Sequence, residues 1–270
     1  MTLIKVSGIH PLLCYDGLTG DLLKAELRDE TLHCSNDADK FMEPLLDEYL
    51  ERGLKTYLRG DSGFSSTKLY KICEMNGCSY SIRLEQNSSL LALASDKDEE
   101  LYKATRNNHI NYAVTYGEFM YQAGSWDYPR RVFFKIEKPY GQLTHMYTFI
   151  VTNMDMKPYQ IIQFYCGPGK MENFIKEGKS GFDFASISSH SKMVTANRMR
   201  LHILAYNLFN WFRRLALPAN IRKQQIEPIR LKLIKIAARA VKSARYITFK
   251  LCSSCPYKKN SIRRWKISRN

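Results

Sequence analysis

The chain has 270 residues, 44% of them hydrophobic, and a mean hydropathy of −0.37, which suits a soluble globular protein with one large domain or two modest ones. No apolar run is long enough to span a bilayer, and the N-terminus lacks a signal-peptide pattern, so we expect neither a membrane protein nor an exported one. Seven cysteines, an odd number without framework spacing, are typical of reduced thiols in a cytosol.

The formal net charge of +15 is unevenly distributed along the chain. Residues 191–270 hold 20 Lys and Arg and a single acid, a net +19, whereas the other residues hold 21 Lys and Arg and 25 acids, a net −4. A basic block of this kind favours a polyanionic partner, and DNA is the obvious one. A solvated basic face that serves only solubility is the alternative.

The first third of the chain predicts alternating strands and helices. A hairpin turns at Asp16-Gly17, where turn chemistry explains Asp16 and Asp21 better than catalysis does. Asp61 directly follows a strand, which is where open α/β sheets hold ligands. The hairpin, helix, strand, helix, strand order is typical of α/β proteins. The predicted elements are strands at 9–15, 22–27, 55–59 and 79–84 and helices at 37–52 and 67–76.

Residues 87–145 interrupt this order. They contain an acidic run between 96 and 100 and an alternating strand at 131–137. The stretch that separates Asp61 from Glu172 is too long for a plain loop, so we interpret residues 87–145 as a β-rich insertion. A further strand is expected at 146–151.

The C-terminal part predicts two helices and a strand. Residues 197–217 are apolar nearly all round, so we expect a buried helix. A second helix opens at Glu227-Pro228 and carries basic residues on its outer faces. A last strand is expected at 246–251, followed by a loose basic tail at 258–269. The apolar stripe of the second helix consists of Ile229, Leu233, Ile236 and Ala240.

A carboxylate surrounded by lysines lies near the middle of the chain. Glu172, Lys176 and Lys179 follow one another at helical spacing, so we expect them on one exposed helical face. A carboxylate among cations suits a divalent metal beside a phosphodiester, with the carboxylate on the metal and the lysines on the phosphates. An ordinary Glu–Lys pair on a solvated helix is the alternative.

The spacing around this glutamate resembles a known motif. Tyr165, Pro168, Glu172 and Lys179 are separated by two, three and six residues. This resembles the Tyr-x2-Arg-x3-Glu-x6-Lys motif of DDE-type insertion-sequence transposases. Pro168 stands where the motif has its arginine, and a proline cannot replace a guanidinium that binds phosphate through two hydrogen bonds.

Segments on either side resemble the same family in the right order. Residues 58–64 are similar to its second-aspartate segment, Arg-x-Asp-Ser-Gly-Phe, and residues 196–198 and 204–208 resemble the helix that follows the catalytic glutamate. The family's first catalytic aspartate, carried on an early strand, has no counterpart, so we expect an N-terminally truncated copy. Either residues 1–6 fill the place of that strand without a carboxylate, or the sheet is open there.

The resemblance implies an α/β fold with a ribonuclease-H-like mixed sheet and flanking helices, incomplete at the N-terminus and interrupted by a β-rich insertion. We expect four parts on this basis. They are a first part of the core at 1–86, the insertion at 87–145, a second part of the core with the glutamate helix at 146–217, and a basic C-terminal region at 218–270.

The resemblance also implies the chemistry, which is phosphoryl transfer on DNA with Mg²⁺, or Mn²⁺, held by carboxylates. Asp61 and Glu172 are the expected catalytic and metal-binding residues, and their carboxyl groups are expected within about 8 Å of each other because the two ions lie about 4 Å apart. The residues expected to bind DNA are Arg59, Tyr165, Lys170, Lys176, Lys179 and Arg198.

The expected partners are DNA and further copies of the chain assembled on transposon ends, without a membrane. The expected location is the bacterial cytoplasm, in association with the nucleoid. Two alternatives to an active transposase remain open. One is a catalytically inactive fragment that still binds DNA, and the other is a host-adopted nuclease that uses two carboxylates.

Overall fold

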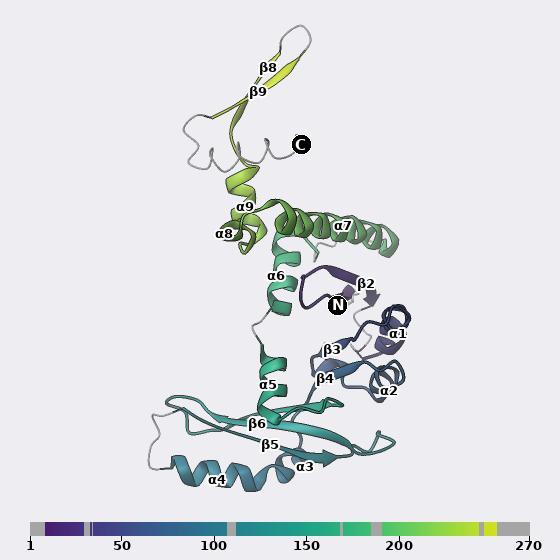
Figure 1. Ribbon diagram of the computed structural model, residues 1–270, viewed down its shortest axis with the longest axis vertical. Coiled ribbons are helices and arrows are strands. Elements are labelled where there is room, and N and C mark those ends of the chain that lie inside the picture. Colours follow the sequence, from purple (N-terminus) through teal and green to yellow (C-terminus); the bar gives the residue numbers. More distant parts are fainter. Residues whose placement is uncertain are drawn as a thin grey trace, which may run out of the picture. The chain divides into compact units, whose positions relative to one another are not determined.

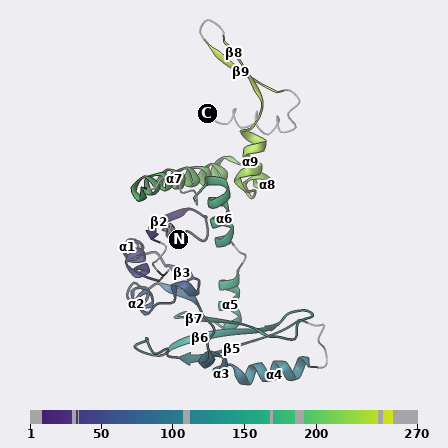
Figure 2. The same ribbon diagram turned by 180° about the vertical axis from the view of Figure 1, so that it is seen from behind.

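The computed structural model describes residues 9–29, 33, 35–106, 112–167, 170–184, 191–242 and 246–252. They form two compact units. The sheet unit holds the described residues between 33 and 167, and the helix unit holds those of 9–29 and 170–252. Figures 1 and 2 show the elements of both units from opposite sides.

A five-stranded mixed sheet forms the centre of the sheet unit. Its strand order is β3-β4-β7-β6-β5, in which β3 and β4 are parallel and the remaining pairs are antiparallel. Helices cover the sheet, so the predicted α/β class with a mixed sheet and flanking helices is confirmed. The strands are β3 (Tyr57–Gly60), β4 (Ser79–Leu84), β5 (Ala113–Tyr121), β6 (Arg130–Lys138) and β7 (Met146–Thr152).

The two faces of this sheet have separate cores because side chains alternate along each strand. Phe133 and Ile150 point toward α5 (Pro158–Cys166) and pack with its Ile161 and Ile162. Their neighbours Phe134, Phe149 and Val151 belong to the larger core on the opposite face. Figure 1 shows α5 on one side of the sheet and α3 and α4 on the other. The helices that contribute to the larger core are α1 (Ala38–Glu51), α2 (Thr67–Met75), α3 (Ser88–Leu93) and α4 (Ser95–Thr105).

The segment interpreted as an insertion contains helices as well as strands. Its acidic run lies in α4, and its strands β5 and β6 extend the central sheet by pairing next to β7. β6 is buried along most of its length because both of its faces are covered. Boundaries of a separate part at 87–145 remain a prediction.

The helix unit begins with the predicted hairpin, β1 (Ile9–Tyr15) and β2 (Leu22–Asp29), which is confirmed. Its core contains Tyr15, Leu22, Phe182 and Tyr206. A second, separate hairpin lies near the C-terminus. The other elements are α6 (Lys170–Phe182), α7 (Lys192–Ala216), α8 (Ala219–Arg222), α9 (Ile226–Leu233), β8 (Ala238–Lys242) and β9 (Ile247–Leu251).

Polar contacts fasten the first hairpin to α7. Asp16 accepts hydrogen bonds from the backbone of Leu18 and the hydroxyl of Thr19, which confirms its role in the turn. Asp21 instead forms a two-bond ion pair with Arg214, at 2.8 and 2.7 Å. Burial alone would raise the pKa of Asp21, but hydrogen bonds from Arg214 and other α7 side chains hold it below its usual value.

Two expectations for the C-terminal part are wrong. The helix at 197–217 is not buried all round: against the described residues α7 packs along one side, and Leu201 and Leu215 are 66% and 87% exposed. The helix that opens near Glu227 ends at Leu233 instead of reaching Ala240. Residues 238–242 form a strand because pairing with β9 satisfies their backbone groups as well as a helix would.

The expectations for residues 1–6 and for the tail at 258–269 lie outside the described residues. None of the helices in the described part of the chain is long and apolar enough to cross a membrane.

Candidate functional site

Asp61 lies immediately beyond the carboxyl end of β3. The chain turns here into a short 3₁₀ helix, η1 (Ser62–Phe64), and the Oδ1 atom of Asp61 accepts the backbone N–H of Ser62 at 2.7 Å. Gly60 permits this tight turn, because a Cβ at that position would lie 3.3 Å from the Cβ of Phe64. Asp61 is exposed, and among the described residues nothing donates a hydrogen bond to its Oδ2 atom.

The face of β3 that carries Tyr57 and Arg59 lies against the C-terminal end of α5. The ring of Tyr57 contacts that of Phe164, with 6.2 Å between their centres. The Nη1 atom of Arg59 donates to the backbone oxygens of Phe164 and Tyr165, at 3.5 and 3.2 Å. A cation at a helix C-terminus stabilises the free carbonyl groups there. Arg59 therefore holds the end of α5 beside Asp61.

Tyr165 lies within the electrostatic range of Asp61. Burial first, and then the negative charge of Asp61, raise the pKa of Tyr165 to about 12 against the opposing charges of Arg83 and Arg59. Part of the Tyr165 side chain packs on the apolar cluster under α5. Tyr165 is therefore a neutral phenol near pH 7, half-buried at the edge of a small group of charged side chains.

Arg83 is a residue of this group that the sequence did not identify. The parallel pairing of β3 with β4 ends at Gly60 opposite Ile82, and Asp61 and Arg83 are the residues that directly follow this last pair. Arg83 is exposed near the end of β4. Tyr165 thus lies within electrostatic range of one exposed carboxylate and two arginines. The alternating pattern of β4 places Arg83 at an exposed position of the strand. Only the pairing of β4 with β3 brings Arg83 to the same end of the sheet as Asp61.

In the helix unit, α6 carries the second candidate carboxylate. Glu172, Lys176 and Lys179 are all exposed on one face of α6, as predicted. Lys170 is the first residue of the same helix. Arg198 is exposed on α7. In the described part of the chain, no hydrogen bond or ion pair engages the side chains of Glu172, Lys176 and Lys179.

The opposite face of α6 is fixed by Glu177, which the sequence analysis did not single out. Its buried carboxylate binds Nη1 of Arg213 with both oxygens and accepts the backbone N–H of Ile226. Gly178 allows close packing beside it, because a Cβ there would lie 2.6 Å from the ring of Phe184. These contacts orient α6 so that Glu172 faces outward.

The candidate residues therefore form two groups, one in each unit. Asp61, Arg59 and Tyr165 lie together in the sheet unit, and Glu172 lies with Lys176 and Lys179 in the helix unit. The meeting of Asp61 with Glu172 stays a prediction. Among the described residues, no three His, Cys, Asp or Glu side chains gather in a way that could hold a metal ion.

The two carboxylates nevertheless fit a hard divalent cation as single ligands. Each is exposed, and each keeps at least one oxygen without a hydrogen bond from the described residues. Carboxylate oxygens are the ligands that Mg²⁺ and Mn²⁺ prefer. One protein carboxylate or two, together with substrate phosphates, is a usual set of Mg²⁺ ligands in proteins.

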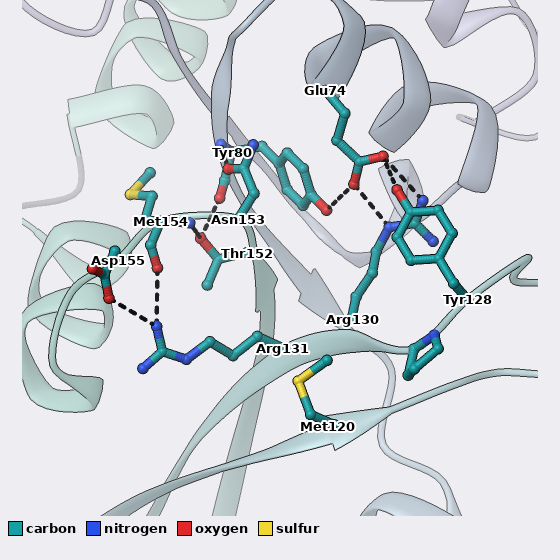
Figure 3. A pocket seen from close by; sticks show the side chains of 11 residues that line it. Glu74, Tyr80, Met120, Tyr128, Arg130, Arg131, Thr152, Asn153, Met154 and Asp155 are labelled. Carbon is teal, nitrogen blue, oxygen red and sulfur yellow. Dashed lines mark hydrogen bonds and ion pairs between the residues drawn. The ribbon is translucent and has the colours of Figure 1, made fainter.

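A separate pocket of about 240 Å³ in the sheet unit has a structural role (Figure 3). Glu74 at its wall accepts hydrogen bonds from Tyr80, Tyr128 and Arg130. Burial alone would raise the pKa of Glu74, but these hydrogen bonds, that from Arg130 first, hold it below its usual value. The network ties α2 to β4 and β6, and it contains none of the residues predicted to be functional.

Comparison with protein-family models gives a match over residues 3–266, to the model described as Transposase DDE domain group 1. A search of curated proteins gives no match. The matched range runs through both units and contains Asp61, Glu172 and their neighbours.

Proposed function

Because the chain belongs to the family Transposase DDE domain group 1, we propose that it acts in DNA transposition, by metal-dependent phosphoryl transfer at insertion-sequence ends. Members of this family act on DNA and generally use divalent metal ions. The metal that we propose for this chain is Mg²⁺ or Mn²⁺.

One observation carries the proposal: an exposed Asp61 with a free carboxylate oxygen lies within electrostatic range of Tyr165, as do the cations Arg83 and Arg59. Asp61 forms no ion pair within the described residues, so its carboxylate is available to a ligand. A phosphodiester group brings negative charge that the exposed Arg83 can bind, and the Asp61 carboxylate would hold a metal ion beside it.

Glu172 is the proposed second ligand. Lys176 and Lys179 stand on the same face of α6, so they neutralise phosphates next to a metal held by Glu172. Lys170 and Arg198 extend the proposed DNA contact along the helix unit. Arg59 is a positioning residue. Its guanidinium binds the backbone oxygens at the end of α5 and thereby positions Tyr165.

Metal ions held by Asp61 and Glu172 would stabilise charge on the phosphate and activate the attacking water or 3′ hydroxyl. The chain itself binds and orients the DNA backbone. Tyr165, kept neutral by burial and by the charge of Asp61, donates a hydrogen bond to a phosphate oxygen. Asp61 and Glu172 contribute two ligands.

The proposal includes self-association of the chain on transposon ends. The exposed side of α7 carries apolar residues at alternating steps of three and four, the spacing at which one helix packs against another. A second copy with the same stripe is a complementary partner. The proposed location is the bacterial cytoplasm, in association with the nucleoid. The stripe consists of Leu201, Leu204, Leu208, Trp211 and Leu215.

Strand cleavage of DNA that carries the element's own ends, in Mg²⁺ or Mn²⁺, tests the proposal. Asp61→Asn and Glu172→Gln should each abolish the cleavage. Asp47→Asn and Glu43→Gln are matched controls, because both residues are exposed on α1. Binding without cleavage by the unaltered chain favours an inactive DNA-binding protein. Cleavage that ignores the element's ends favours a host-adopted nuclease.

A further inference from the structure

The second hairpin, β8–β9, stands apart from the rest of the helix unit. Its two strands pair only with each other in the described part of the chain, and Figure 1 shows them as a separate ribbon beyond α9. Ile247 and Phe249 are 63% and 68% exposed. An isolated two-stranded hairpin is at best marginally stable in water. Within the described residues, the ribbon therefore lacks the packing that normally stabilises such a structure.

The pairing brings like charges together on one face. Arg239 lies directly opposite Lys250, and on the same face Val241 lies opposite Thr248. Like charges directly opposite each other destabilise a pair of strands. Both cations are exposed, and in the described part of the chain no carboxylate pairs with either. This arrangement becomes favourable only when negative charge arrives from outside.

Residues 238–252 contain four Lys and Arg and no acid. The single acid of the C-terminal part, Glu227, is already paired with Arg230 at 2.8 Å and Lys235 at 3.7 Å. Residues 191–270 therefore contain no further carboxylate that could pair with the cations of the ribbon. The excess positive charge of the ribbon suits a polyanionic partner.

The shape of the ribbon favours double-stranded DNA over double-stranded RNA as this polyanion. The major groove of B-DNA, about 12 Å wide, admits a two-stranded β-ribbon, whereas the deep, narrow major groove of double-stranded RNA does not. Thr248 and Arg239 offer donors that reach base edges, and Lys242 on the other face is free to approach a phosphate.

We propose that the β8–β9 ribbon binds double-stranded DNA by entering its major groove, with the face that bears Arg239, Thr248 and Lys250 toward the base edges. This inference rests on the proposed function and deepens it, because it names the element that binds the DNA on which the chain acts. The ribbon is separate from the residues assigned to the reaction, so its loss weakens binding without removing a metal ligand.

The test is binding of the full chain to a DNA duplex of about 30 base pairs, measured by fluorescence anisotropy over a range of salt. The double variant Arg239→Gln/Lys250→Gln should bind roughly tenfold more weakly or worse at each salt concentration, because both cations face the base edges. Lys97→Gln/Lys103→Gln, an equal change of net charge on α4, should leave the affinity unchanged. Methyl green, which occupies the major groove, should compete with the ribbon, and netropsin, which occupies the minor groove, should not.

Equal affinities for the double variant and the unaltered chain would overturn the inference, as would competition by netropsin alone. An equal loss on a double-stranded RNA of the same length would also contradict it, because that groove excludes the ribbon. The proposed function stands or fails by cleavage at the element's ends. Cleavage by the unaltered chain together with an unchanged double variant therefore rejects the ribbon alone.

Discussion

Arg213 and Glu177 form a close ion pair in the helix unit, with Nη1 of the arginine 3.0 Å from Oε1 and 3.1 Å from Oε2 of the glutamate. The same carboxylate accepts the backbone N–H of Ile226 at 2.8 Å. Glu177 is only 4% exposed. Because Glu177 and Glu172 lie on opposite faces of α6, the buried pair decides how the candidate metal ligand is presented.

Replacing Glu177 should destabilise the helix unit. Glu177→Ala leaves Arg213 without its partner and Ile226 without an acceptor, so we expect a loss of about 3–5 kcal/mol in the free energy of unfolding. Glu177→Gln keeps an acceptor and should cost less. Urea denaturation followed by circular dichroism measures both variants. Glu172→Gln, an exposed change on the same helix, should stay within about 0.5 kcal/mol; a loss at Glu172 as large as that at Glu177 would contradict the assignment.

Local patterns predicted the first hairpin and the elements from α1 to β4. Their boundaries are set by signals that act over a few residues, such as Gly53 and Gly77, which follow α1 and α2 with φ of 68° and 61°. The stripe that ends in Ile236 and Ala240 has the spacing of a helix, so its pattern favoured the wrong structure. Pairing with β9 in the hairpin that follows selected the strand instead.

The sequence likewise predicted only those residues of the candidate site that have a local signal. Asp61 and Glu172 were identified by their local context, a strand end and a helical face. Arg83 was missed because its relation to Asp61 depends on strand pairing, and Glu177 was missed because its importance depends on burial against Arg213. The exposure of α7 was unpredictable for the same reason, since burial depends on which elements pack against a helix.

The Glu74 network should make the sheet unit sensitive to acid. The pKa of Glu74 lies below the usual 4.5, so the carboxylate contributes stability that is present above about pH 4.5 and is lost as the pH falls through the lowered value. Glu74→Gln should lower stability at pH 7 and reduce its change between pH 5 and 3. The urea midpoint, measured against pH for both proteins, checks this. Equal pH dependence in the two proteins would show that the network contributes nothing.

The exposed stripe of α7 should mediate self-association. Leu204→Glu and Leu208→Glu place charge in the stripe, so each should shift the chain toward the monomer by about tenfold or more in dissociation constant. Sedimentation equilibrium measures the shift. Leu18→Glu is the control, because Leu18 is 89% exposed in the turn of the first hairpin. A monomeric unaltered chain, or an equal shift in the control, would argue against an interface on α7.

The most direct test of the central claim is a crystal structure of the chain with Mn²⁺ and DNA, in which the anomalous signal of manganese locates the metal. We expect a manganese peak bound by both Asp61 and Glu172, with their carboxyl groups within about 8 Å of each other. Carboxylates on opposite faces of the molecule, or a manganese peak that contacts neither residue, would contradict it.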